Sequence, residues 1–249
     1  MNRSRSKGKR SDAKSAPSNV KQERMASTQI NPFSAAHDPC EAVNPSGLAG
    51  IRVINASPDT VANVFINGDH CFYDVSYGQL TAYARVTPGF RSLRTLVRDA
   101  NGRESELETT LSLHSDSEYT VAVVGDFPEL EQIVVKDTTA PPKQGRIRIR
   151  FWNLAPGIGP VDMLTGDGVD IFRNVDYKEV TGFAEINAGK ADLHFRRAGQ
   201  GSDIGTVEGL VLEPTGRYTF ILLAKRGLEG PFNVVPVRDP FGATKVLAH

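Results

Sequence analysis

The sequence predicts an all-β protein with two tandem immunoglobulin-like or fibronectin-like sandwiches behind a basic, disordered N-terminal arm. Three observations support this fold class. The chain of 249 residues carries one pattern twice, about a hundred positions apart. Apolar residues alternate with a period near two, and turn residues interrupt them about every eight to twelve positions, as in sandwiches. A tyrosine follows a turn at the same place in both copies.

Matched residues at both ends define the repeat. Ile51-Arg52 returns as Ile149-Arg150, and Lys136-Asp137 returns as Arg238-Asp239. The spacing between matched residues drifts only from 98 to 102 positions. Such a small drift places the insertions in loops of one duplicated fold.

The first copy is predicted to contain about eight short strands. Ile51 begins the first strand, and Pro58 ends it because proline has no amide donor for a sheet. Asn67-Gly68 predicts a hairpin turn, since this pair readily adopts the positive φ angles of tight turns. The other predicted strands are 62–66, 71–75, 80–86, 92–98, 104–111, 119–124 and 132–136.

The second copy repeats this order of strands. Trp152, the only tryptophan, is expected to be buried at a strand end or between the two domains. The predicted strands are 147–154, 161–164, 169–175, 180–186, 191–197, 206–212, 218–224 and 233–237.

Tyr119 and Tyr218 are predicted to be structural. Residues 212–218 resemble the tyrosine corner of immunoglobulin-like sandwiches, in which the hydroxyl bonds backward to the backbone. Residues 113–119 keep the same interval in the first copy.

These features divide the chain. We expect an arm over residues 1–48, sandwiches over 49–138 and 146–240, a linker over 139–145 and a tail over 241–249. The linker is short and contains two prolines. We therefore expect the sandwiches to lie end to end with a restricted orientation.

The arm is strongly basic. Residues 1–24 carry eight Lys or Arg and two acidic residues, a net charge of +6, and since the whole chain has 29 of each sign, the remainder carries −6. With so few large apolar side chains, the arm is predicted to be disordered. It is either a solvated tail or a binding arm for an anionic partner, such as nucleic acid, a teichoic-type polymer or the acidic surface of a neighbouring subunit.

No signal peptide is recognised, because no apolar stretch follows the basic start. The longest apolar run, near residues 219–224, is far shorter than the roughly 18 residues of a membrane span. The sequence therefore predicts a soluble protein that is made in the cytoplasm and has no membrane span.

The chain has two cysteines, Cys40 and Cys71, and the second copy has none. They are either two ordinary thiols of a reducing compartment or a crosslink formed at an oxidising surface. The crosslink would join the arm to the first domain or one subunit to another. Two cysteines exclude a structural zinc site of four thiolates.

No catalytic, cofactor-binding or metal-binding residues are predicted, so we expect no enzyme. Residues 201–205 resemble a nucleophile elbow, but the serine is misplaced. Asp162 and the carboxylates of residues 166–170 are too few for a calcium loop. His70 and Cys71 are strand neighbours that point to opposite faces, which argues against a shared metal.

Four segments of the first copy carry a family resemblance: Arg52–Asp59, Val64–Gly68, Val75–Gly78 and Val86–Gly89. They resemble the R-V-x-H/N-A-S-P-D start, V-D-V-x-V-D-G hairpin and V-P-A-G turn of a bacterial family, domain of unknown function 4397. The resemblance covers residues 51–137 well and 147–239 more weakly. It implies a β-sandwich that often occurs in tandem in cell-envelope proteins, with no established catalytic residues.

Together, these features predict a non-enzymatic structural or interaction module of a bacterial cell envelope or spore surface. A protein laid onto a spore from the mother cell needs no signal peptide. Its partners would be envelope or spore-surface proteins or polymers, and self-association is open. The alternative is a small-ligand or glycan-binding module that uses the sandwich loops or the inter-domain junction, with Tyr77, Tyr177 and Phe232 as candidate contacts. A third alternative, an uncharacterised hydrolase, lacks an acid, base and nucleophile set.

Overall fold

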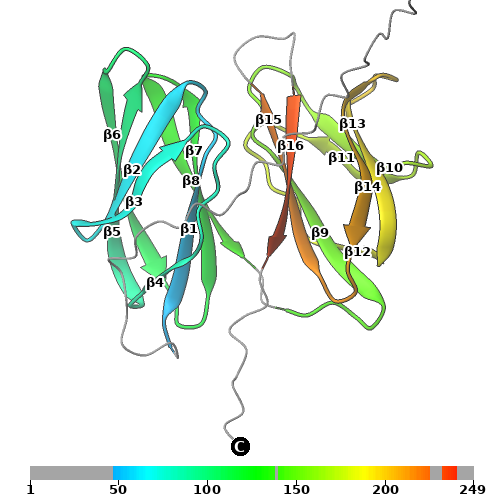
Figure 1. Cartoon of the computed structure of the whole chain (residues 1–249), viewed down its shortest axis with the longest axis horizontal. Coiled ribbons are helices and arrows are strands. Elements are labelled where there is room, and N and C mark those ends of the chain that lie inside the picture. The colour runs from blue at the N-terminus through cyan, green and yellow to red at the C-terminus, as the bar shows by residue number, and fades with distance from the viewer. Residues whose placement is uncertain (1–46, 138–139, 225–231, 240–249) are drawn as a thin grey trace, which may run out of the picture. The chain divides into compact units, whose positions relative to one another are not determined.

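The computed structural model describes residues 47–137, 140–224 and 232–239. These residues form strands β1 to β16 and no helix, in four sheets of four strands (Figure 1). They all belong to one unit, Pro32–His249. The predicted all-β class and the two sandwich-like halves are confirmed.

The first half consists of one sheet in the order β4-β1-β7-β8 and a second in the order β3-β2-β5-β6. Every pairing within these sheets is antiparallel except β1 with β7, which run parallel. The strands are β1 Ala49–Asn55, β2 Thr60–Ile66, β3 Asp69–Ser76, β4 Ala84–Val86, β5 Gly89–Asp99, β6 Glu104–Leu113, β7 Glu118–Asp126 and β8 Glu129–Asp137.

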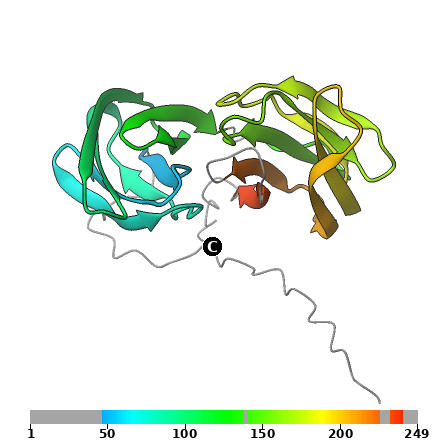
Figure 2. The same cartoon turned by 90° about the horizontal axis from the view of Figure 1, so that it is seen from above.

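The second half has the same topology, with sheets in the orders β12-β9-β15-β16 and β11-β10-β13-β14. Figure 2 shows each half from above as layers of strands. The strands are β9 Arg146–Asn153, β10 Val161–Thr165, β11 Asp170–Val175, β12 Ala184–Asn187, β13 Gly189–Arg197, β14 Asp203–Leu212, β15 Arg217–Ala224 and β16 Phe232–Asp239.

The strand order refines the type of sandwich. In immunoglobulin domains the first two strands share a sheet. Here β1 and β2 lie in different sheets, because β1 pairs in parallel with β7, with Ile51 opposite Tyr119. In the second half Ile149 lies opposite Tyr218 in the same way. The first strand of each half is thus central in its sheet.

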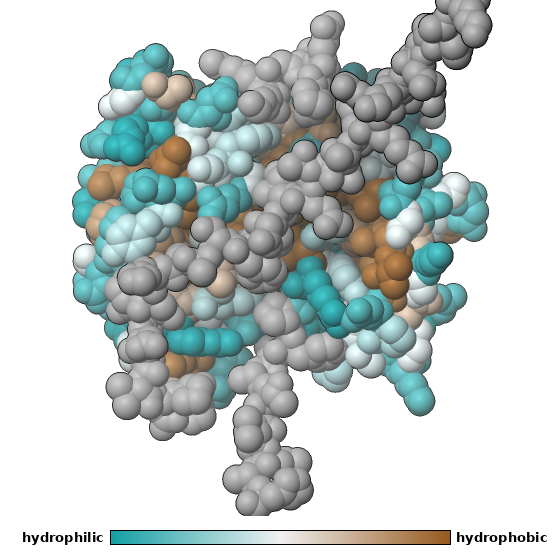
Figure 3. All heavy atoms as spheres, in the orientation of Figure 1, coloured by the Kyte–Doolittle hydropathy of each residue, from teal (hydrophilic) through white to brown (hydrophobic). Residues whose placement is uncertain are grey.

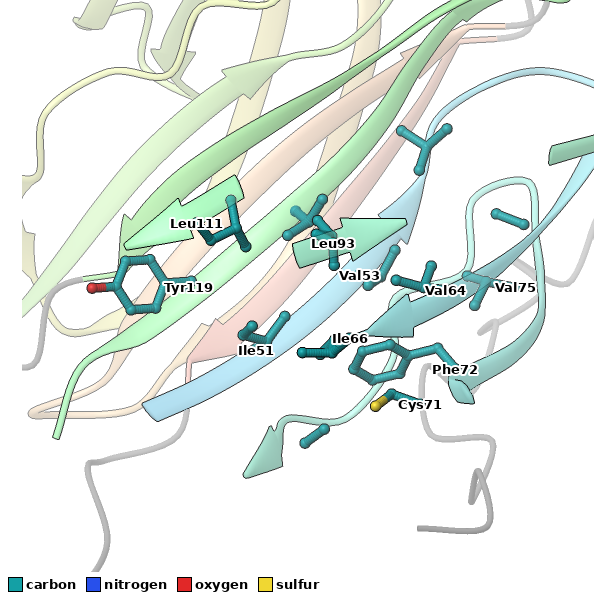
Figure 4. Packing of buried hydrophobic residues seen from close by; sticks show 14 of the residues in the cluster. Ile51, Val53, Val64, Ile66, Cys71, Phe72, Val75, Leu93, Leu111 and Tyr119 are labelled. Atoms are coloured by element: carbon teal, nitrogen blue, oxygen red, sulfur yellow. The ribbon is translucent and has the colours of Figure 1, made fainter. Parts of the chain in front are cut away.

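Each half has its own apolar core between its two sheets. In the first half, Ile51 and Val53 of β1 face Val64 and Ile66 of β2, and Leu93 of β5 completes the layer (Figure 4). These five side chains are at most 3% exposed. Burial alternates along β2, as the period of two predicts, whereas every residue of β1 is buried.

Two predicted turn features are explained by local geometry. Asn67 and Gly68 have φ angles of 51° and 91°, which confirms the predicted hairpin turn. Strand β4 begins at Ala84, later than the predicted residue 80. The reason is that the Thr81 hydroxyl, and not a backbone carbonyl, accepts the Val53 N–H at 2.9 Å.

The first strand of each half ends in a buried asparagine, Asn55 or Asn153, three residues before a proline. The Asn55 amide group donates to the Val75 carbonyl at 3.0 Å, and its oxygen accepts the Ser57 N–H at 3.0 Å. Asn153 donates to the Val175 carbonyl, also at 3.0 Å. Each asparagine thus satisfies backbone groups that the turn after the strand leaves open.

The two repeated tyrosines make the same backward hydrogen bond. The Tyr119 hydroxyl accepts the backbone N–H of His114 at 3.1 Å, and the Tyr218 hydroxyl accepts that of Glu213 at 2.9 Å. Both rings are about 5–6% exposed. This is the bond that defines a tyrosine corner.

Candidate functional site

Strands β7 and β15 are buried on both faces. Every residue from Glu118 to Val124 is buried, and so is every residue of β15. Along β7, Val121 belongs to the core of the first half, whereas Ala122 and Val124 belong to a cluster that both halves share. A sheet with one solvated face would alternate between buried and exposed residues. The second buried face is therefore an interface between the halves.

The shared cluster is apolar and contains Trp152. This side chain is fully buried, and its indole N–H donates to the Lys178 carbonyl at 3.3 Å. The expectation that Trp152 is buried is confirmed. Because the contact runs through sheet faces, the expected end-to-end placement is wrong. The buried members are Ile54, Ala56, Leu80, Ala122, Val124, Trp152, Leu154, Ile221, Leu223 and Val237.

Two arginines and two aspartates cross this interface reciprocally. Arg52 of the first half donates to Asp239 of the second at 2.5 Å. Arg150 of the second half donates to Asp137, which ends the first half. All four side chains are at most 5% exposed. We call these four residues the charge cluster.

Threonines fix the orientation of the charge cluster. The Arg52 Nε donates to the Thr120 hydroxyl at 2.8 Å, and that hydroxyl donates to Asp137 at 2.7 Å. In the second half, Thr219 accepts from Arg150 at 2.9 Å and donates to Asp239 at 3.0 Å. Each carboxylate thus receives hydrogen bonds from both halves.

An aromatic ring covers each arginine. The Arg52 guanidinium carbon lies 4.6 Å from the centre of the Tyr83 ring, and that of Arg150 lies 4.9 Å from the Phe183 ring. The Tyr83 hydroxyl also donates to Asp137 at 2.7 Å. Burial raises the pKa of Tyr83 far above its usual value, and the nearby Asp137 carboxylate adds to this, although Arg52 opposes it. The phenol therefore stays neutral and acts as a donor.

The surroundings favour the ionised forms of Asp137 and Arg52. Burial alone would favour the neutral form of Asp137, but Arg150 and Arg52 hold the pKa of this carboxyl below its usual value. Burial likewise opposes the charge on Arg52, yet Tyr83, Asp239 and Asp137 raise its pKa. The arrangement stabilises charges inside the protein and thereby joins the halves. Removing one partner from such a buried pair costs about 3–5 kcal/mol.

The charge cluster was not predicted from the sequence, although its four residues were recognised as matched residues of the repeat. Arg52, Arg150, Asp137 and Asp239 are the charged residues that mark the ends of the repeat. The usable signal was their recurrence next to apolar strands, combined with the continuous apolar run of residues 218–224, which is typical of a strand buried on both faces.

The predicted loop contacts lie in three different environments. The Tyr177 hydroxyl meets the backbone of Gly125, so it lies at the junction of the halves; burial and then Asp126 and Glu131 raise its pKa. Phe232 begins β16 and packs against the core of the second half. Tyr77 borders the shared cluster.

Tyr77 also lines a depression of about 440 Å³ at the loop end of the first half. Burial, reinforced by Asp59, raises the pKa of Tyr77 to about 12. Polar and apolar groups both line it; the residues are Asp59, Thr60, Val61, Ser76, Tyr77, Arg98, Asp99 and Ala100.

Cys71 lies in the core of the first half beside Phe72, only 3% exposed (Figure 4). Its sulfur is disulfide-bonded. Residues 1–46 of the predicted arm, which include Cys40, lie outside the described residues. The predicted tail over 241–249 lies outside them as well. The Cys40–Cys71 crosslink stays a prediction.

Among residues 47–137, 140–224 and 232–239, no group of three or more His, Cys, Asp or Glu side chains is placed to hold a metal. His194 contacts Asp203 at 2.5 Å, and Arg196 shares the same carboxylate. This exposed group lies on β13 and β14. Nor does that part of the chain contain a helix with the length and apolar character needed to cross a membrane.

Residues 49–164 match the model of a family described as a domain of unknown function (DUF4397). The match contains the strands of the first half, β9 and β10 up to Leu164, and it confirms the resemblance over the first half. For the second copy the resemblance stays a prediction. No curated protein matches the chain.

Two solved structures show a distant likeness. One is a Bacteroides fragilis protein with a suggested role in cell adhesion, 7% identical, covering 76% of this chain and 86% of its own, with a TM-score of 0.21. The other is a fimbrial assembly protein from Parabacteroides distasonis, 11% identical, covering 79% of this chain and 100% of its own, with a TM-score of 0.20. Likenesses this distant do not indicate a function.

Proposed function

We propose that this chain is a non-enzymatic structural or interaction module of a bacterial cell envelope or spore surface. The observation that carries the proposal is the interface between the halves. Arg52 pairs with Asp239 and Arg150 with Asp137, inside a shared apolar cluster. Two sandwiches joined in this way form a stiff unit, which suits a part that spaces or presents binding surfaces.

The family match over residues 49–164 supports the proposal. The sequence resemblance associates such domains, often in tandem, with cell envelopes. In this proposal the partners are envelope or spore-surface proteins or polymers, and the second half is a further copy of the same domain.

The N-terminal arm has a separate role in the proposal. Its eight basic residues between positions 1 and 24 would bind an anionic polymer or protein surface. A Cys40–Cys71 disulfide within the chain would tie the arm to the first half.

Localisation tests the surface assignment. A fluorescently tagged chain, followed through growth and sporulation in its own bacterium, is expected at the envelope or on the spore. Cell fractionation should recover it with the envelope or the spore coat. A diffuse cytoplasmic signal at every stage would reject the assignment.

A small polar ligand, such as a glycan, is the second candidate. The depression at Tyr77 favours it, since Arg98 and Asp99 give it hydrogen-bonding groups of both charges. Binding on a glycan array should be lost in Tyr77→Phe and Arg98→Ala. Tyr177→Phe, the equivalent change in the other half, is the matched control. Unchanged binding in all three variants would exclude the depression as the site.

A further inference from the structure

The two halves differ in charge at the position before the repeated tyrosine. Several polar positions of the interface recur, as Thr120 and Thr219 do, but Arg85, which pairs with Glu118, is replaced by Glu185, and Tyr83 is replaced by Phe183. Glu118, however, occupies in β7 the place that Arg217 occupies in β15. Both precede the repeated tyrosine, and both lie opposite the terminal aspartate of the half, Glu118 opposite Asp137 and Arg217 opposite Asp239.

Both residues lie on the interface side of their strands. Side chains alternate along a strand, so Glu118 shares the face of Thr120 and Ala122, and Arg217 shares that of Thr219 and Ile221. Their side chains are almost completely buried, with 3% exposure of Glu118 and 1% of Arg217.

Glu118 has only partial support within its own half. One carboxylate oxygen lies 3.4 Å from Arg85, while the structure gives the other oxygen no hydrogen-bond partner among the described residues. Burial raises the pKa of Glu118; Arg85 of the first half opposes this rise most, and Arg217 of the second half and Arg52 also oppose it. Glu118 and Arg217 lie opposite Asp137 and Asp239, and both of these aspartates meet Arg52, so β7 and β15 bring opposite charges to the same part of the interface.

The charges of Glu118 and Arg217 affect which halves can pair. The reciprocal charge cluster is compatible with any pairing, because each half supplies one arginine and one aspartate. Two first halves would bring Glu118 against a second Glu118, and two second halves would bring Arg217 against a second Arg217. Like charges in a buried interface disfavour the wrong partner.

We propose that the face formed by β1, β7 and β8 is a recognition surface for the second half, and that Glu118 and Arg217 are its specificity pair. The partner is the second half of the same chain or, by exchange of halves, that of another copy. The pairing follows from the interface and does not depend on where the protein resides.

Charge reversal in the full chain tests the proposal. E118R and R217E each create a like-charged interface, and the double variant E118R/R217E restores opposite charges. Each single change is expected to lower Tm by roughly 5–10 °C for a chain of this size. The double variant should recover at least half of that loss. E131K, which reverses an exposed charge facing Lys178 across the same halves, is the control and should change Tm little.

Mixing the two single variants gives a second readout. Exchange of halves between E118R and R217E restores opposite charges at both interfaces, so light scattering should show a 1:1 dimer that neither variant forms alone. If a reversal prevents folding, Glu118→Gln and Arg217→Gln measure the coupling instead. Additive losses in the double variant, or single variants as stable as the original chain, would overturn the proposal.

Discussion

The charge cluster is alike in the two halves where they meet, whereas Glu118 and Arg217 differ there and the outward-facing sheets differ more widely. At the interface, Arg52 and Arg150 make equivalent ion pairs. On the outer sheets equivalent positions carry different residues, such as His70 and Asp170. Hydrophilic and hydrophobic residues both appear on the face drawn in Figure 3. The contrast indicates that the joint between the halves constrains the repeat, whereas the outer sheets are free to acquire separate binding properties.

The edge strands β3 and β11 show the outward difference most clearly. In the first half, His70 stacks between Phe65, at 4.3 Å between ring centres, and Tyr73, at 3.6 Å. In the second half, Leu164 lies opposite Asp170, as Phe65 lies opposite His70. Asp170 there forms an ion pair with Arg173. An aromatic stack in the first half thus occupies the positions at which the second half has an exposed ion pair.

Breaking the joint should have the largest effect. Asp239→Ala leaves the buried Arg52 without its closest partner, and such a loss costs about 3–5 kcal/mol. For a chain of this size that corresponds to a fall in Tm of roughly 6–20 °C. Thermal unfolding followed by circular dichroism measures it.

Asp170→Ala is the matched control, because it removes an aspartate from an exposed ion pair of the outer sheet. Its Tm should stay close to that of the original chain. Equal losses in the two variants would contradict the assigned role of the charge cluster.

The first half also differs from the second by Cys71, whose equivalent in β11 is Ile171. If Cys71 is joined to Cys40, Cys40→Ser removes a crosslink that contributes about 2–4 kcal/mol in typical proteins. Non-reducing peptide mapping should show the joined peptides in the original chain only. A chain whose Tm is the same with and without reductant would exclude a stabilising crosslink.

Acid should weaken the joint selectively. The folded pKa of Asp137 lies below the ordinary value of 3.8. A carboxyl with a lowered pKa contributes stability above its unfolded pKa and loses it as the pH falls through the folded pKa. The urea concentration at the midpoint of unfolding should therefore decrease as the pH is lowered below about 4. Asp137→Asn should make that decrease shallower. An unchanged decline in this variant would show that other carboxyls cause it.

Alternating apolar residues were sufficient to predict the strands and the two halves, and Asn67-Gly68 was sufficient to predict its hairpin. The interface was not predicted, because the periodicity of a strand does not tell what covers its second face. Arg52 and Asp137 were recognised as repeated residues, yet charged residues near strand ends are usually solvated. The Tyr77 depression combines three loops that are distant in sequence, so only the fold brings its residues together.

Exchanging the outer edges should have the smallest effect on stability and the most specific effect on binding. The triple variant Phe65→Leu, His70→Asp and Tyr73→Arg gives the first half the residues of the second. Tyr73 is 45% exposed, and an aromatic pair at such a site contributes about 0.5–1.5 kcal/mol. Tm should thus fall by only a few degrees, since the charge cluster is untouched. If the outer sheet of the first half binds a surface partner, co-sedimentation of the purified chain with envelope or spore fractions should be lost. Retained co-sedimentation would assign the binding to the arm or the loops.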